Sequence, residues 1–114
     1  MEIIMAVTEL TDATFEETLK STGQTVLVDF FAEWCNPCRM LSPVIDELSE
    51  EMRGVMFAKI NVDRAKETAQ RYGIMSVPTL MVFSNGRLGA SFTGVASKSQ
   101  ITELISNVSG EADV

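Results

Sequence analysis

Two cysteines, Cys35 and Cys38, are the residues of this 114-residue chain best suited to chemistry, and the chain has no others. They follow an apolar run over residues 26–31 and precede a long helical pattern, so we expect Cys35 at a strand-to-helix turn and Cys38 in the first helical turn. Side chains three apart on a helix have Cβ atoms about 5–6 Å apart. A disulfide accepts Cα atoms about 4.4–6.8 Å apart. The two sulfurs can therefore join or separate with only local adjustment, as a redox couple requires.

The position of the two cysteines also predicts reactive thiols. The first N–H groups of a helix lack intrahelical partners and favour an anion, so a thiol there ionises readily, and the thiolate is the nucleophile. Pro37 suits an early helical position, and Arg39 adds positive charge. We expect Cys35, nearest the turn, to be the more exposed and to attack. Cys38, about one turn in, should be more covered and should resolve a mixed disulfide.

Two other uses of the cysteine pair remain open on the sequence. A purely structural disulfide would close a loop of four residues and contribute roughly 1.9 kcal/mol, against about 3 kcal/mol for a loop of fifteen. A zinc site usually needs four nitrogen or sulfur ligands. The chain has no histidine and no further cysteine, so such a site would need carboxylates or a second subunit. We therefore favour redox use over a structural or metal site.

The composition predicts one ordinary globular domain spanning residues 1–114, with a polar C-terminal tail over 109–114. The formal charge of −7 argues against nucleic acid and anionic membranes as partners, since both select basic patches. The start of the chain lacks the basic region of a signal peptide, and no apolar run approaches a membrane span. We expect a cytoplasmic protein, and in that compartment a Cys-x-x-Cys pair is more often catalytic than a permanent bridge.

Hydrophobic periodicity and turn residues predict an alternating β-α-β-α-β-α pattern closed by a hairpin and a helix. The expected strands are 3–7, 26–31, 55–62, 80–83 and 87–93, the last two joined at Asn85-Gly86. The expected helices run from Thr11 or Asp12 to about Lys20, from Cys35 to about Arg53 with a kink at Pro43, from Asp63 for a short stretch, and from a Ser97 cap to about Val108. This order indicates an α/β fold, with helices covering both faces of one sheet.

Asp29 is anomalous because it lies within the apolar run of a strand expected to be covered on both faces. A buried carboxylate is costly unless it is paired or functional. Burial would raise its pKa, which suits a proton acceptor working near neutral pH. Asp29 lies six residues before Cys35, and we expect it beneath Cys38. The alternative is a solvated strand end with Asp29 exposed.

The segment over residues 29–38, with the sequence Asp-Phe-Phe-Ala-Glu-Trp-Cys-Asn-Pro-Cys, resembles the active-site segment of the thioredoxin family. Further motifs in matching order are Lys59, Val77-Pro78-Thr79 and Gly94. The resemblance covers residues from about Thr8 to Val108. It implies the thioredoxin fold, a central mixed five-stranded β-sheet flanked by four helices.

The resemblance also implies roles for the matched residues. Asp29 would help to move the proton of Cys38, and Lys59 would lie near that carboxylate and tune the transfer; an exposed lysine at a strand edge is the alternative. The Val77–Pro78 bond would be cis and would face the cysteines, leaving the Val77 backbone able to pair with an extended peptide. Gly94 would border the site, or would merely end a strand.

The function implied is a thiol–disulfide oxidoreductase that reduces disulfides in client proteins. The Cys35 thiolate would attack, Cys38 would resolve, and a separate thioredoxin reductase would restore the dithiol. No bound cofactor is needed, since the electrons reside on the sulfurs, and we expect a monomer. The residues expected along the client are Trp34, Asn36, Pro37, Val77, Pro78 and Gly94.

Two positions depart from the family pattern. Asn36 replaces a glycine, and it could donate hydrogen bonds to a thiolate or narrow the client surface. Phe31 stands where many thioredoxins have tryptophan, which should alter packing more than chemistry. Two other functions remain open: a disulfide oxidase or isomerase on the same fold, and an adaptor that binds through the apolar rim around Trp34 without a redox cycle.

Overall fold

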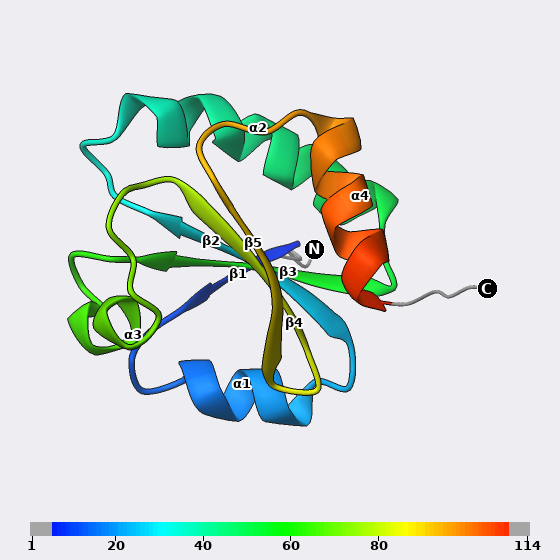
Figure 1. The fold of residues 1–114 in the computed structure, drawn as a ribbon, viewed down its shortest axis with the longest axis horizontal. Coiled ribbons are helices and arrows are strands. Elements are labelled where there is room, and N and C mark those ends of the chain that lie inside the picture. The colour runs from blue at the N-terminus through cyan, green and yellow to red at the C-terminus, as the bar shows by residue number, and fades with distance from the viewer. Residues whose placement is uncertain (1–5, 110–114) are drawn as a thin grey trace, which may run out of the picture.

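The structure is a computed structural model that describes residues 6–109. Strands and helices alternate along the chain before a closing hairpin and helix (Figure 1). The strands are β1 (Val7–Leu10), β2 (Thr25–Phe31), β3 (Val55–Asn61), β4 (Thr79–Ser84) and β5 (Arg87–Thr93). The helices are α1 (Phe15–Ser21), α2 (Asn36–Glu51), α3 (Lys66–Arg71) and α4 (Lys98–Ser109). None of the helices within residues 6–109 is long and apolar enough to cross a bilayer.

The strands form one mixed sheet in the order β1-β3-β2-β4-β5. Strand β3 pairs in parallel with β1 and β2, whereas β4 is antiparallel to both β2 and β5. Strand β2 is central, and its residues from Val26 to Phe30 are all buried. The predicted mixed five-stranded sheet is therefore confirmed, and β2 delivers the chain from the middle of that sheet to the cysteines.

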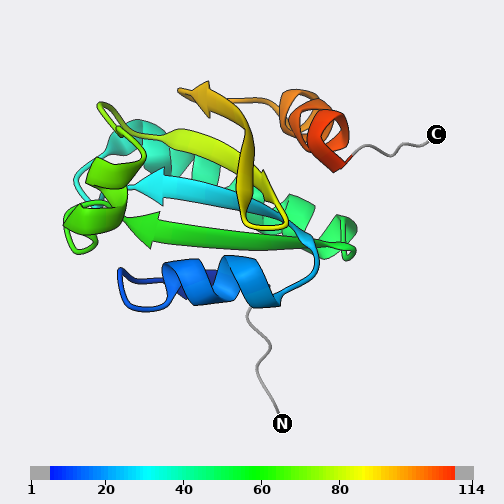
Figure 2. The same cartoon turned by 60° about the horizontal axis from the view of Figure 1, so that its bottom comes forward.

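Helices cover both faces of the sheet, as predicted; Figure 2 shows α1 and α4 on opposite sides. One core layer joins α2 and α4 to the sheet through Leu41, Ile45 and Ile105, which pack with Leu27 of β2. Because strand side chains alternate, Asp29 shares the face of Leu27 and lies under α2. The sheet thus places this carboxylate on the same side as the helix that carries Cys38.

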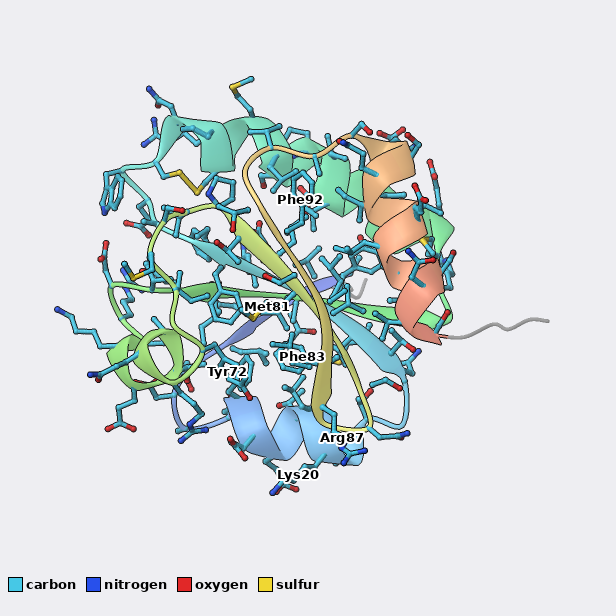
Figure 3. The ribbon with its side chains drawn as sticks, viewed as in Figure 1. Lys20, Tyr72, Met81, Phe83, Arg87 and Phe92 are labelled. Carbon is cyan, nitrogen blue, oxygen red and sulfur yellow. A yellow bond between two sulfur atoms is a disulfide. The ribbon has the colours of Figure 1, made fainter. Side chains whose placement is uncertain are left out.

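The opposite core layer is aromatic and packs α1, together with the residues that flank α3, against the sheet. Phe15 lies 5.5 Å from Tyr72 and 5.7 Å from Phe83, and Tyr72 lies 5.4 Å from Phe83, between ring centroids. Figure 3 shows Tyr72, Met81 and Phe83 clustered above α1. This layer stabilises the face of the sheet that is turned away from α2.

Several predicted boundaries are wrong. Helix α1 is regular only from Phe15, later than predicted. The predicted Thr11 cap is nevertheless present one turn earlier: the Thr11 hydroxyl accepts from the Thr14 N–H at 3.3 Å, and the Thr14 hydroxyl accepts from the Thr11 N–H at 3.0 Å. Helix α3 begins at Lys66 rather than Asp63. Strand β1 begins at Val7, where the predicted first strand was to end, and residues 3–5 of that prediction lie outside the described part of the chain. The polar tail beyond residue 109 lies outside it as well.

Asp12 caps a helix other than the one expected. Its carboxylate accepts hydrogen bonds from the backbone N–H groups of Glu67 and Thr68 and from the Thr68 hydroxyl, at 3.3, 2.8 and 2.7 Å. The bond from the Thr68 side chain is the main reason why the pKa of Asp12 is lowered. Asp12 therefore anchors the start of α3 to the β1–α1 loop.

Two local predictions, the Ser97 helix cap and the Asn85-Gly86 turn, are confirmed. The Ser97 hydroxyl accepts from the Gln100 N–H at 3.2 Å while the Gln100 side chain accepts from the Ser97 N–H at 2.9 Å, which is a capping box at the start of α4. Asn85 and Gly86, with φ of 53° and 78°, form the turn between β4 and β5.

Helix α2 continues through Pro43, and the predicted kink there stays a prediction.

Candidate active site

Cys35 and Cys38 form a disulfide at the N-terminus of α2, with their Cα atoms 5.3 Å apart. Cys35 is the N-cap residue, in extended backbone conformation, and Cys38 lies in the first turn, as predicted. The Cys38 backbone N–H donates to Cys35 Sγ at 3.1 Å. A thiolate at Cys35 would therefore occupy the position in which a capping side chain accepts a free N–H of the helix.

The expectation that Cys35 is more exposed than Cys38 is wrong for the disulfide form. Both residues are buried, with 3% of Cys35 and 5% of Cys38 exposed. Cys35 Sγ lies 3.7 Å from the Val77 carbonyl oxygen, and Ala32 packs against both cysteines. Exposure does not distinguish the two sulfurs, whereas the N–H donated to Cys35 does.

Three further predicted residues, Val77, Pro78 and Gly94, are linked to Cys35 through Val77. The Val77–Pro78 peptide bond is cis, as predicted, and the Val77 carbonyl faces Cys35. Gly94, directly after β5, donates its N–H to the Pro78 carbonyl at 2.8 Å. Its φ of 108° lies in the left-handed region, which glycine adopts without strain. The loops before β4 and after β5 are thus joined beside the disulfide.

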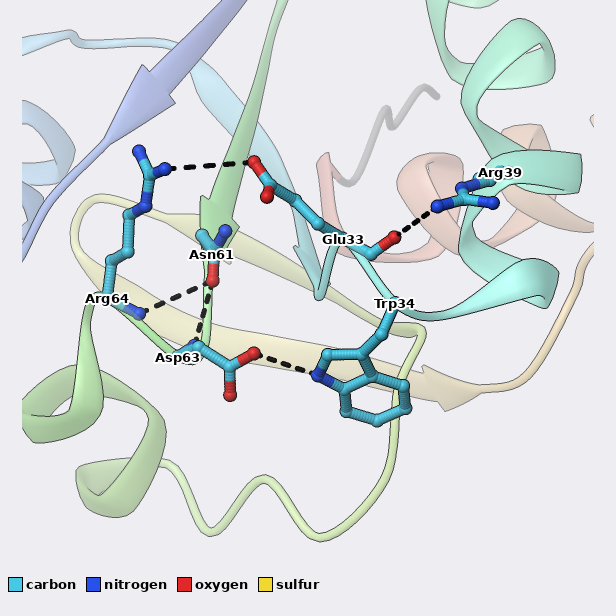
Figure 4. A network of polar contacts seen from close by, with 6 residues as sticks. All are labelled: Glu33, Trp34, Arg39, Asn61, Asp63 and Arg64. Carbon is cyan, nitrogen blue, oxygen red and sulfur yellow. Dashed lines mark hydrogen bonds and ion pairs between the residues drawn. The ribbon is translucent and has the colours of Figure 1, made fainter.

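Trp34 directly precedes Cys35 in the chain, and 69% of its surface is exposed. Its indole N–H donates to Asp63 Oδ2 at 2.8 Å, as Figure 4 shows. Asp63 is held in turn by the buried Asn61, whose Oδ1 accepts from the backbone N–H groups of Asp63 and Arg64 at 2.8 and 3.3 Å. Sequence reasoning missed Asn61 and Asp63, although two polar residues at the end of an apolar strand were the available signal.

Arg39 ties the chain before the disulfide to helix α2 (Figure 4). Its guanidinium donates to the Glu33 carbonyl at 2.8 Å and to Asn36 Oδ1 at 3.4 Å. The Glu33 carboxylate also lies 3.8 Å from the Arg64 guanidinium. Asn36 and Pro37 are exposed in the first turn, and the Asn36 amide oxygen is directed toward Arg39.

Asp29 is buried, with 5% of its surface exposed, so the alternative of a solvated strand end is wrong. Its Oδ1 has no hydrogen-bond partner within the described residues. Burial raises the pKa of Asp29 to about 7, while the charge of Lys59 opposes that rise and the charge of Asp46 adds to it. Lys59 is the cross-strand partner of Asp29, and it is half-buried rather than fully exposed at an edge.

A cavity of about 400 Å³ connects these groups. Asp29, Cys38 and Lys59 all line it, and the rest of its lining is Phe31, Ala32, Glu33, Arg39 and Ser42. Asp29 and Cys38 thus share one solvent-accessible space. Across residues 6–109, no three cysteine, aspartate or glutamate side chains are grouped closely enough to hold a metal ion.

Comparisons with known proteins agree with this geometry. The thioredoxin family model matches residues 6–107. A thioredoxin of Pseudomonas aeruginosa is 39% identical over 100 residues, covering 87% of this chain and 93% of that protein. Thioredoxins of Rickettsia bellii and Allochromatium vinosum are each 43% identical, covering 86% and 88% of this chain and 94% of each relative.

The sequence similarity and the geometry of the site therefore agree. The match extends over nearly the whole chain, and the redox-capable cysteine pair lies at the start of a helix fed by the central strand. The chain belongs to the thioredoxin family and is a thiol–disulfide oxidoreductase of the protein-disulfide reductase type.

Proposed function

We propose that this oxidoreductase reduces client disulfides through a nucleophilic Cys35 and a resolving Cys38, with Asp29 as the proton acceptor for Cys38. One observation carries the proposal: Cys35 caps α2, and its disulfide partner Cys38 shares a cavity with a buried carboxylate of raised pKa. A structural disulfide has no need of such a neighbour, whereas a resolving thiol needs a base.

In the first step the Cys35 thiolate attacks one sulfur of a client disulfide. A bond forms between Cys35 Sγ and that sulfur, and the second client sulfur leaves as a thiolate. The Cys38 N–H, 3.1 Å from Cys35 Sγ, supports this step because it stabilises the anion before attack. Arg39, one helical turn after Cys35 in α2, adds positive charge to the same region.

In the second step the Cys38 thiol gives its proton to the Asp29 carboxylate, directly or through water in the cavity. The Cys38 thiolate then attacks Cys35 Sγ, which restores the intramolecular disulfide and releases the reduced client. A pKa of about 7 suits Asp29 to accept a proton near neutral pH. Lys59 acts as a tuning residue, because its charge favours the ionised form of Asp29.

The client would lie across residues around the disulfide, of which Trp34, Asn36 and Pro37 are exposed, Val77 and Gly94 half-buried and Pro78 buried. Trp34 supplies an apolar wall, and the Val77 backbone pairs with an extended client segment. Gly94 has no side chain to hinder the approach of that segment. The remaining proposed contacts are Asn36, Pro37 and Pro78.

We further propose that a separate thioredoxin reductase returns the disulfide to the dithiol, that the protein works as a monomer, and that it acts in the cytoplasm. Residues from about 8 to 108 would act as one domain. The electron path needs no bound cofactor, since two electrons are carried by the change from disulfide to dithiol.

An insulin assay driven by a small dithiol tests the proposal. The wild type should precipitate the insulin chains, and Cys35→Ser should not. Cys38→Ser should accumulate a mixed disulfide between Cys35 and the client, which mass spectrometry would identify. If a Cys35→Ser, Cys38→Ser double variant retained biological activity, the protein would instead be an adaptor. If the reduction potential of the cysteine pair lay far above that of other thioredoxins, the protein would be an oxidase or isomerase.

A further inference from the structure

Phe31 is an aromatic residue of the cavity to which the proposed reaction gives no role. It lies two residues after Asp29 on β2, so both side chains point to the α2 face of the sheet. Phe31, Asp29 and Lys59 all line the cavity that Cys38 also lines. The ring is therefore placed to act on the charges around the proposed base.

The Lys59 ammonium is directed to the Phe31 ring. Lys59 Nζ lies 5.6 Å from the ring centroid, within the range over which an aromatic face attracts a cation. Lys59 and Asp29 are direct partners across β2 and β3, yet no ion pair within 4.0 Å joins them in the described chain. The Asp29 Oδ1 atom also has no hydrogen-bond partner there. The cation thus contacts the ring and leaves the neighbouring carboxylate without a contact ion pair.

This placement has a consequence for proton transfer. A lysine in contact with a buried carboxylate favours its ionised form strongly, whereas the same charge at a greater distance favours it less. Lys59 lowers the pKa of Asp29 by less than burial raises it, and the net value is about 7. The other charged or titratable groups around Asp29 are Asp46 and Cys38 on α2, with Glu33 and Arg39 in the cavity lining.

We propose that Phe31 is a positioning residue, whose ring holds the Lys59 ammonium off the Asp29 carboxylate and so keeps Asp29 able to accept the Cys38 proton near neutral pH. This inference rests on the proposed role of Asp29. It also changes the interpretation of the departure at position 31, because the aromatic ring then contributes to chemistry as well as to packing.

The test is a carbon-13 NMR titration of the Asp29 side-chain carboxyl in the oxidised protein. Phe31→Leu and Phe31→Met keep apolar bulk but remove the aromatic face, so Lys59 is free to approach Asp29. The pKa of Asp29 should fall by about half a pH unit, the size expected for an aromatic–cation contact of this kind. Phe31→Trp, which keeps an aromatic face, should leave the pKa near its native value.

A Lys59→Met background separates this inference from a simple packing effect. Without the ammonium, Phe31→Leu should leave the pKa of Asp29 unchanged, since the ring acts through Lys59. Phe92→Leu is a matched control for the loss of a phenylalanine ring elsewhere in the protein, because Phe92 is a half-buried phenylalanine of β5 that packs in the core.

An unchanged pKa in both Phe31→Leu and Phe31→Met, or an equal fall with and without Lys59, would overturn the inference. A failure of Asp29 to serve as the base would appear instead in turnover, as an Asp29→Asn protein that resolves mixed disulfides at the wild-type rate. The two ideas therefore fail in different measurements.

Discussion

Replacing Asp29 by asparagine should stabilise the oxidised protein relative to the wild type as the pH rises. The pKa of Asp29 is raised by burial from 3.8 to about 7, so the folded protein holds this proton more tightly than the unfolded chain does. Ionisation then favours unfolding. The stability that the protonated carboxyl allows is fully present below the unfolded pKa and is lost as the pH rises through the folded pKa.

The size of this effect follows from the interval between the two pKa values. Each unit corresponds to about 1.36 kcal/mol, so the interval from 3.8 to about 7 predicts a loss of about 4 kcal/mol in the wild type. An asparagine does not titrate, and any packing penalty it brings is the same at every pH. The difference in unfolding free energy between variant and wild type should therefore grow in favour of the variant across this range.

Guanidinium unfolding of both oxidised proteins, repeated at intervals from about pH 4 to pH 8, measures this difference. Glu103→Gln is the matched control, because Glu103 is an exposed carboxylate on α4. It should show no comparable divergence. A difference between Asp29→Asn and wild type that stays constant with pH would refute the conclusion that Asp29 is a buried carboxyl of raised pKa.

Three other substitutions test separate contacts. Asp63→Ala removes the acceptor of the Trp34 indole N–H, which loosens the apolar side chain proposed to contact the client. It should lower kcat/KM for insulin reduction about five- to tenfold. An unchanged value would contradict this role of the contact. Gly94→Ala should lower the unfolding free energy by about 1 kcal/mol, because alanine is strained at the positive φ of this position. A steric clash does not contribute, since the added Cβ would meet no atom. An unshifted unfolding midpoint would argue against backbone strain. Asp12→Ala should lower the melting temperature, because it removes the cap of α3. The pKa of Asp12 is lowered in the folded protein, so its stabilisation is present at higher pH and is lost as the pH falls through the folded pKa. The difference in melting temperature should therefore disappear in acid. Equal losses at all pH values would contradict that cause.

Local patterns account for the part of the fold that was predicted correctly. Leu41, Ile45 and Leu48 recur at helical spacing and are buried against the sheet. The run over residues 26–31 is apolar at every position except Asp29, and it forms the central strand. Asn85 and Gly86 both tolerate positive φ and make the predicted hairpin turn. Each of these signals depends only on neighbouring residues.

The features that sequence reasoning missed are contacts between distant segments. Asp12 is a plausible cap for the next helix, yet its partners lie 55 and 56 residues away. The Trp34–Asp63 bond spans 29 residues. The burial of Cys35 depends in part on Val77, 42 residues further along. Local capping and exposure rules contain no information about such distant partners. Asp29, by contrast, could be identified from the sequence, because a carboxylate within an apolar strand is anomalous by itself.

The central claim is that Cys35 is the ionisable, attacking thiol and Cys38 the resolving one. Alkylation of the reduced protein with iodoacetamide across a pH series, with the labelled residue located by mass spectrometry, tests it most directly. Labelling should occur first at Cys35, with a pKa below the value of about 8.5 for a free cysteine. Labelling that begins at Cys38, or a Cys35 that titrates as an ordinary free thiol, would contradict the account.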